Sequence, residues 1–336
     1  LHREAGYNRY FFLLAMFVTG MVLVALAGNV EVLFAGWEFV GLSSALLVAF
    51  FHERPAPVSN ALRVFSVYRI SDAAMLAAAV LLHHVAGSGS LSLLFGDATA
   101  AQLTGVNATM IAVLLIVAVA GKSALLPFSG WLPRAMEGPT PSSAVYYGSL
   151  SIHAGCFLLL RAAPLLEQSP AARLLAGGIG AATALYSSLT TRVQSDVKSS
   201  LAYASLTQVG IIVVEIALGL YALAFLHLVG HACFRLLQFL SAPNVLHDLH
   251  GLEAAVGERL TPAGGYLETM IPDGVRRRLF LFALERGFVD AVLDRLVVDP
   301  FYRVTRLMSR LDRFLCEVVT RPTPAIIVEG GDDRDD

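Results

Sequence analysis

Nine ionisable side chains lie within long apolar runs of this 336-residue chain. They are Glu38, Arg69, Asp72, Lys122, His153, Glu215, His227, His231 and Arg235. Ionisable groups in apolar segments cost several kcal/mol each and usually mark the path of an ion. His, Glu and Lys in successive segments can exchange protons, because burial disfavours the charged form of each. We therefore predict a proton pathway that uses Glu38, Lys122, His153, His227 and His231.

Lys122 is one of only two lysines, and it lies within "IAVLLIVAVAGKSALLPFSGWLP" at 111–133. Proline removes a backbone hydrogen bond and breaks a helix, so we expect a helix break at Pro127. Irregular backbone at membrane depth is tolerated only where it is buried in protein or lines water. A broken helix just after a buried lysine therefore predicts a hydrated gate.

The spacing of the remaining groups indicates which of them can meet. Arg69 and Asp72 are three residues apart, so one helix face carries both and they can pair. His227, His231 and Arg235 follow one another at intervals of four and stack on one face. Arginine is not deprotonated in proteins, so Arg235 can bias a neighbour but cannot relay a proton. We assign Arg69, Asp72 and Arg235 charge-modulating or structural roles.

Several ordinary interpretations stay open beside these. Arg69 and Asp72 could be only a structural ion pair, and Lys122 could extend its ammonium to the membrane surface. The HxxxH spacing could hold a metal, but no carboxylate or Cys ligand flanks it, so we predict no metal and no cofactor. The "GKS" at 121–123 lacks the earlier glycine of a phosphate-binding loop, because Ile116 stands there. Without a GxSxG or HExxH motif, the chain is not expected to be an enzyme by itself.

Membrane-spanning helices must position these groups. The chain is 56% hydrophobic and 15% charged, whereas a soluble domain has about 25% charged residues. We expect an all-α polytopic membrane protein in which one helix is broken after Lys122. Eight spans are predicted, at about 10–28, 32–51, 61–84, 108–128, 141–162, 172–190, 200–219 and 221–241.

The domain boundaries follow from the change in composition after the eighth span. We expect a transmembrane domain at 1–245, a linker at 246–275, amphipathic helices at 276–322 and a disordered acidic tail at 323–336. We expect the protein in the cell (inner) membrane. The Arg and Lys residues are concentrated in one set of loops, which predicts that both ends of the chain lie in the cytoplasm. A basic amphipathic helix there lies on membrane lipid or on a protein partner.

Charge and cysteine content exclude other classes. A net charge of −2 argues against a nucleic-acid partner. The three cysteines are isolated, so neither a disulfide framework nor a CxxC metal site is expected. Because the first residue is Leu1, we expect an N-terminally truncated fragment.

Several stretches resemble the antiporter-like membrane subunits of respiratory complex I and of Mrp-type cation/proton antiporters. They are "VYRISDA" (67–73), "GKSALLPFSGWLPRAMEGPTPSSA" (121–144), "DVKSSLAYASLTQVG" (196–210) and "HLVGHACFRLLQFL" (227–240). The resemblance implies a proton-translocating channel. It also implies that Glu38 and Lys122 are the functional Glu–Lys pair, and that His231 and Arg235 match the central histidine and lysine.

The departures from that family point to one branch of it. Arg235 stands where the family usually has Lys, and the later spans of the complex I L subunit are missing. The chain passes instead to "LERGFVDAVLDRLVVDPFYRV", which resembles the C-terminal segment of that subunit. This short arrangement is most similar to the DabB-like membrane subunit of a two-subunit inorganic-carbon uptake complex.

That resemblance implies a function and a partner. The expected function is proton conduction that drives CO2/bicarbonate uptake by a cytoplasmic, zinc-containing, carbonic-anhydrase-like subunit. Two alternatives stay open: a proton-pumping subunit of NADH–quinone oxidoreductase, and a cation/proton antiporter subunit. In either case the partners are other complex I or antiporter subunits.

Overall fold

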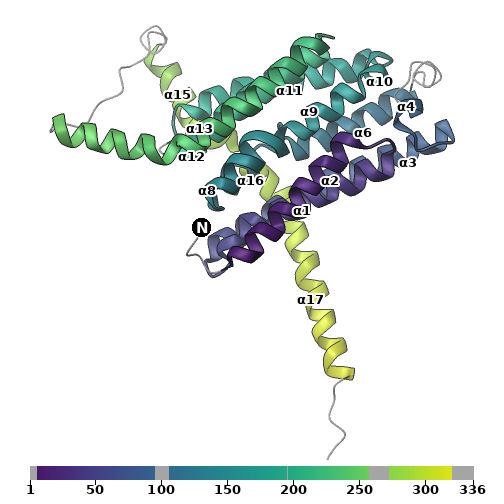
Figure 1. The fold of residues 1–336 in the computed structure, drawn as a ribbon, viewed down its shortest axis with the longest axis horizontal. Coiled ribbons are helices and arrows are strands. Elements are labelled where there is room, and N and C mark those ends of the chain that lie inside the picture. The colour runs from purple at the N-terminus through teal and green to yellow at the C-terminus, as the bar shows by residue number, and fades with distance from the viewer. Residues whose placement is uncertain (1–5, 95–105, 195, 257–271, 320–336) are drawn as a thin grey trace, which may run out of the picture.

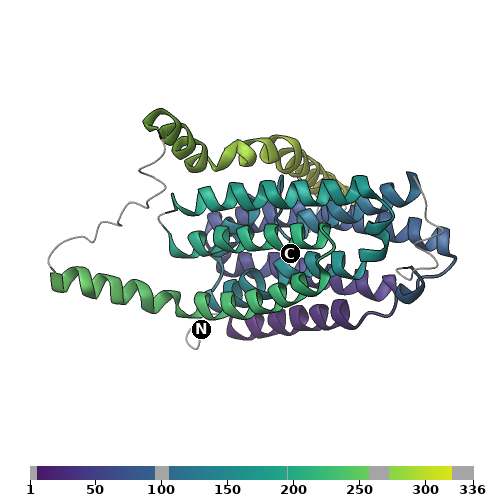
Figure 2. The same ribbon diagram turned by 90° about the horizontal axis from the view of Figure 1, so that it is seen from above.

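A computed structural model describes residues 6–94, 106–194, 196–256 and 272–319 of the chain. Within these ranges the secondary structure is helical, apart from an isolated bridge between Asn29 and Ser90. The long helices lie roughly alongside one another in one bundle, and the C-terminal helices cross it (Figures 1 and 2). The expectation of an all-α polytopic membrane protein is confirmed.

The first three helices form one side of the bundle. They are α1 (Tyr7–Leu26), α2 (Val30–Val48), which continues as η1 (Ala49–Phe51), and α3 (Pro55–Ala86). Asn29 caps α2, since its side chain accepts a hydrogen bond from the Val32 amide at 2.8 Å. A Cβ added to Gly20 would lie 2.9 Å from the Gly36 carbonyl oxygen, so glycine is what lets α1 and α2 approach so closely.

The middle of the chain contains the helix break. After the short α4 (Leu91–Leu94), α6 (Val106–Lys122) ends at Lys122, and irregular backbone continues to α7 (Trp131–Arg134) and η2 (Ala135–Glu137). The break after Lys122 is confirmed, but the helix ends before Pro127 rather than at it. Nearby side chains bond the freed backbone: the Trp131 indole donates to the Gly121 carbonyl at 2.9 Å, and the Leu126 amide to the Thr183 hydroxyl at 3.0 Å.

The following helices complete the bundle. The tract Thr140–Arg161 joins α8 (Thr140–Ser142), the π-helix η3 (Ser143–Leu150) and α9 (Ser151–Arg161). Then come α10 (Ala163–Glu167), α11 (Pro170–Thr191), α12 (Val197–Ala217) and α13 (Tyr221–Val256). A second close glycine contact joins α11 and α12, because a Cβ on Gly210 would lie 2.6 Å from the Gly180 carbonyl oxygen.

Six helical stretches of the described residues, rather than eight, have both the length and the hydropathy of a membrane span. They are Tyr7–Leu26, Val30–Phe51, Pro55–Ala86, Thr140–Arg161, Val197–Ala217 and Tyr221–Ala242. Of the other two predicted spans, the one at 108–128 is shortened because its helix ends at Lys122. The one at 172–190 is helical as α11, but its glycines and its Ser/Thr-rich end lower its hydropathy.

The C-terminal region begins with α15 (Asp273–Leu284) and continues through η4 (Arg286–Phe288), α16 (Val289–Leu293), η5 (Asp294–Val298) and α17 (Asp299–Val319). The expected linker at 246–275 is helical up to Val256, and 257–271 lie outside the described residues, as does the expected tail at 323–336. The segment crosses one face of the bundle, and α17 projects beyond it (Figures 1 and 2).

Candidate functional site

Four of the predicted groups meet where α2, α3 and the end of α6 pack together, and we call them the charged cluster: Glu38, Arg69, Asp72 and Lys122. The Arg69 guanidinium donates to the Glu38 carboxylate at 2.7 Å and to the Asp72 carboxylate at 2.6 Å. Asp72 is almost fully buried, whereas Arg69 and Glu38 are partly exposed on the surface of the chain. One arginine therefore joins the acids of two helices.

Lys122 is fully buried, at 0% exposure, so its ammonium does not extend to the surface. Its Nζ donates to the Trp37 carbonyl at 3.0 Å and lies 3.7 Å from Asp72 Oδ1. The Trp37 and Tyr68 rings also flank it, with Nζ 4.9 Å and 4.4 Å from the ring centroids. Gly41, one turn after Trp37, leaves the space, because a Cβ there would lie 2.9 Å from Nζ. The sequence prediction missed Gly41, although its position four residues after Trp37 was a signal.

The direct acidic partner of Lys122 is Asp72, and not Glu38 as we expected. Glu38 belongs to the same cluster, but its carboxylate is bonded through Arg69. Lys122 does contact α2, but through the Trp37 carbonyl, while the carboxylate of the next residue, Glu38, accepts from Arg69 of α3. The Arg69–Asp72 pair is present, and its acid also faces the lysine.

A second group of residues forms what we call the histidine chain: Ser149, His153, His231 and Arg235. His153 Nδ1 lies 2.5 Å from the Ser149 carbonyl oxygen, and His153 Nε2 lies 2.9 Å from His231 Nδ1. On the far side, Arg235 Nε donates to His231 Nε2 at 3.0 Å, and its Nη1 donates to Gln238 at 2.6 Å. The three ionisable residues of the chain are all buried. The chain links the tract of η3 and α9 to α13.

His227 sits one turn before His231 but makes separate contacts. Its Nδ1 lies 3.0 Å from the Glu215 carboxylate, and its Nε2 lies 3.1 Å from the Gln208 side-chain oxygen. The ring centroids of His227 and His231 are 6.2 Å apart, in edge-on orientation. Both partners come from α12. The sequence prediction named neither of them as a partner, and Gln208, a neutral residue, gave no signal of its own.

Buried hydroxyl groups lie between the charged cluster and the histidine chain. Tyr68, whose ring contacts Lys122, has its hydroxyl beside Ser151, two residues before His153. The Ser123 hydroxyl, next to Lys122 in the chain, has no hydrogen-bond partner within the described part of the protein. Buried polar groups of this kind are the ones that bind water. These buried hydroxyl groups between the two clusters can therefore bind water or one another through hydrogen bonds.

The C-terminal segment is tied to the bundle close to the helix break. Arg134, at the end of α7, donates to Asp290 at 2.9 Å. Arg63 of α3 pairs with Asp294. The sequence prediction did not name these acids, which lie four residues apart on one face. The segment expected to bind a partner thus packs partly against its own chain.

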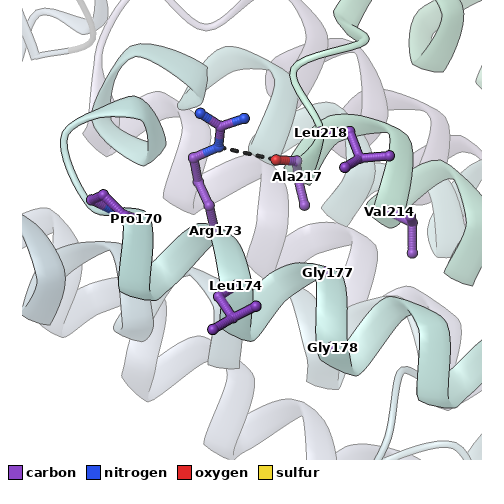
Figure 3. Close-up of a pocket in the computed structure, with 8 residues that line it drawn as sticks. All are labelled: Pro170, Arg173, Leu174, Gly177, Gly178, Val214, Ala217 and Leu218. Atoms are coloured by element: carbon purple, nitrogen blue, oxygen red, sulfur yellow. Dashed lines mark hydrogen bonds between the residues drawn. The ribbon is translucent and has the colours of Figure 1, made fainter.

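Two other features carry no candidate site. A groove between α11 and α12 is lined by apolar residues and glycines around Arg173, whose Nε donates to the Ala217 carbonyl at 3.0 Å (Figure 3). That bond satisfies a free carbonyl at the end of α12. Among the described residues there is also no group of three or more His, Cys, Asp or Glu side chains that could hold a metal ion.

The fold and these clusters define a class: a polytopic helical membrane protein with a lysine at a helix break and polar clusters inside the bundle. The family model described as "NADH:quinone oxidoreductase/Mrp antiporter, TM" matches residues 27–272. The chain therefore belongs to this family of antiporter-like membrane subunits.

Individual relatives agree with this assignment. NADH-quinone oxidoreductase subunit L of Rhodobacter capsulatus is 35% identical over 257 residues, which is 74% of this chain and 36% of the relative. Subunit L of Neisseria meningitidis is 35% identical over 261 residues, or 74% of this chain and 39% of the relative. The chain thus spans little more than a third of these curated relatives.

Solved structures show the same architecture. The Mrp complex from Dietzia sp. DQ12-45-1b contains a chain with a TM-score of 0.68 and 29% identity, and the match covers 86% of this chain and 32% of that one. The archaeal membrane-bound sulfane sulfur reductase matches with a TM-score of 0.61 at 20% identity, over 70% of this chain and 49% of that one. The second likeness concerns the fold alone.

Proposed function

We propose that this protein is a proton-translocating membrane subunit of a multi-subunit complex related to NADH–quinone oxidoreductase and Mrp antiporters. The observation that carries the proposal is Lys122: a fully buried lysine at the end of a broken helix, facing one acid and two aromatic rings. The relatives' names and the family support the same class. The complex lies in the cell (inner) membrane, with the C-terminus of this chain in the cytoplasm.

In this proposal Lys122 is a switch. When its ammonium faces the Asp72 carboxylate, the opposite charge stabilises the protonated form. When the two separate, burial favours the neutral amine and the proton can leave. The irregular backbone that follows Lys122 allows a small local shift to change that distance. Glu38 and Arg69 act on Lys122 indirectly. Arg69 competes with Lys122 for the Asp72 carboxylate, and Glu38 also pairs with Arg69.

The test compares Lys122→Arg with Lys122→Ala in the complex reconstituted into liposomes, with proton flux as the measurement. Arginine keeps the charge but cannot release a proton, so a switch predicts that both variants lose the flux at normal membrane expression. A structural cation predicts that arginine preserves the flux and alanine does not. A fully active Lys122→Arg protein would therefore rule out the switch.

The relatives reported above favour this function over the uptake of inorganic carbon. One observation keeps inorganic-carbon uptake as the second candidate. The C-terminal helices that pack against the bundle follow α13 after only 257–271, a stretch too short to add a further span. This short order of elements is the one expected for the inorganic-carbon uptake subunit. Under that candidate, a cytoplasmic zinc-containing subunit resembling carbonic anhydrase is the partner.

Purification of the native complex separates the two candidates. Co-purifying antiporter or oxidoreductase subunits would support the first. A single large zinc protein as the partner would support the second, together with a growth defect of cells without the complex that added inorganic carbon relieves. The exposed apolar face of α17, with Val304, Leu307, Leu311 and Phe314, is the surface we propose for the partner or the membrane. Removal of 303–319 should release the partner while the spans still insert, and retention of the partner would contradict this surface.

A further inference from the structure

The hydrogen bonds of the histidine chain have a fixed direction, set independently at its two ends. At one end, the Arg235 guanidinium has donors only, so the His231 Nε2 that it contacts at 3.0 Å must accept. At the other end, the Ser149 carbonyl oxygen can only accept, so the His153 Nδ1 at 2.5 Å must carry the hydrogen.

The contact between the two rings fits both conditions. His231 accepts at Nε2, so its hydrogen is on Nδ1 and is donated to His153 Nε2 at 2.9 Å. His153 donates from Nδ1, so its Nε2 is free to accept that hydrogen. The chain therefore runs from Arg235 to His231, His153 and Ser149 with both imidazoles neutral. If either ring were an imidazolium, two hydrogens would face each other at one of these contacts.

In this arrangement neither ring can take up a proton. The one acceptor nitrogen of His153 is occupied by His231, and the one acceptor nitrogen of His231 is occupied by Arg235. We call this state, with both rings neutral and both acceptor nitrogens occupied, the lock. Movement of Arg235 alone would release it, because withdrawal of the guanidinium frees His231 Nε2. Arg235 keeps a second anchor when its Nε leaves His231, because its Nη1 already donates to the Gln238 side chain at 2.6 Å.

We propose that Arg235 is a positioning residue that gates the histidine chain: its bond to His231 holds both imidazoles neutral and closed to protons, and conduction requires that bond to open. Only the claim that Arg235 controls conduction rests on the proposed function. The assignment of the hydrogens on His153 and His231 follows from hydrogen-bond geometry alone. The other titratable group that faces the chain is His227, which is held by Glu215 and Gln208.

Nuclear magnetic resonance of ¹⁵N-labelled histidine tests the lock directly in the native complex in bilayers. In the unmodified protein His153 and His231 should both be neutral with the hydrogen on Nδ1. Arg235→Met removes the donor but keeps an apolar stem of similar length. The Ser149 end still holds the hydrogen of His231 on Nδ1, but His231 Nε2 is now free, so a His231 imidazolium should appear on acidification. An imidazolium, or a hydrogen on Nε2 of His231, in the unmodified protein would overturn the proposal.

Proton flux into liposomes tests the gate. Arg235→Met should raise the flux about tenfold, because a hydrogen bond to a charged group no longer has to open. Arg235→Lys keeps a donor at His231, so it should preserve the tautomer and leave the flux near that of the unmodified protein. Arg173→Met is the control for losing an arginine hydrogen bond, since Arg173 donates to the Ala217 carbonyl from a groove outside both clusters.

The outcomes separate this proposal from the proposed function. If Arg235→Met allows His231 to be protonated but leaves the flux unchanged or lower, the gate is wrong. If Arg235→Met does not fold, Arg235→Lys decides: loss of the Nδ1 tautomer there would overturn the lock, and a flux about tenfold higher with that tautomer retained would overturn the gate. If the unmodified complex conducts no protons, the proposed function and the gate both fail, while the tautomers still confirm or overturn the lock.

Discussion

The charged cluster and the histidine chain lie in one bundle but hold their protons by different means. In the charged cluster, two cations share two acids, and Lys122 is stabilised by charge and by aromatic faces. In the histidine chain, the two imidazoles are neutral, and each bond depends on which nitrogen carries the hydrogen. The first region can therefore be disturbed by removing a charge, and the second by removing a donor.

The largest expected effect is on the charged cluster. Asp72→Ala leaves Arg69 and Lys122 without their shared acid, and breaking a buried pair in this way costs about 3–5 kcal/mol. The thermal unfolding of detergent-solubilised protein and the yield of folded protein are the measurements. Arg69→Ala with Asp72→Ala should cost less than the sum of the single changes. Strict additivity would show that the two residues are not coupled.

A smaller effect is expected when the cluster is crowded without changing its charge. Gly41→Ala would place a Cβ 2.9 Å from Lys122 Nζ and displace the ammonium from the Trp37 carbonyl. Overpacking of this kind costs about 1–3 kcal/mol. Gly230→Ala in α13 is the control, because a Cβ there meets nothing within 4 Å. The control should be as stable as the unmodified protein, and equal stability of both variants would contradict the tight fit at Lys122.

The smallest effect on stability is expected in the histidine chain. His231→Gln loses neutral or singly charged hydrogen bonds, so unfolding should become easier by only about 1–2 kcal/mol. Proton flux should nevertheless be lost, because an amide does not titrate in this range. Thermal unfolding and liposome flux measured on the same preparation give the two values. If stability falls as far as in Asp72→Ala, the contrast between the two regions is wrong.

Much of this arrangement follows from the sequence, because apolar runs predict spanning helices and buried charges stand out within them. The helix break and the pairing of Arg69 with Asp72 were predictable from local spacing. The choice of Asp72 over Glu38 as the neighbour of Lys122 was not, since it depends on how three helices turn their side chains where they meet. Gln208 gave no signal because a neutral side chain does not stand out as a buried charge does.

The close glycine contacts described above have a mechanical consequence. Gly20 meets Gly36, and Gly180 meets Gly210, with no room for even one more carbon atom. Each of these helix pairs therefore resists sliding and behaves as a stiff unit. The irregular backbone at 123–130 lies between the two units in the chain, and α7 just beyond it is held by the ion pair of Arg134 with Asp290. A displacement of the C-terminal segment would thus move α7 through the Arg134–Asp290 ion pair and shift the irregular backbone next to Lys122.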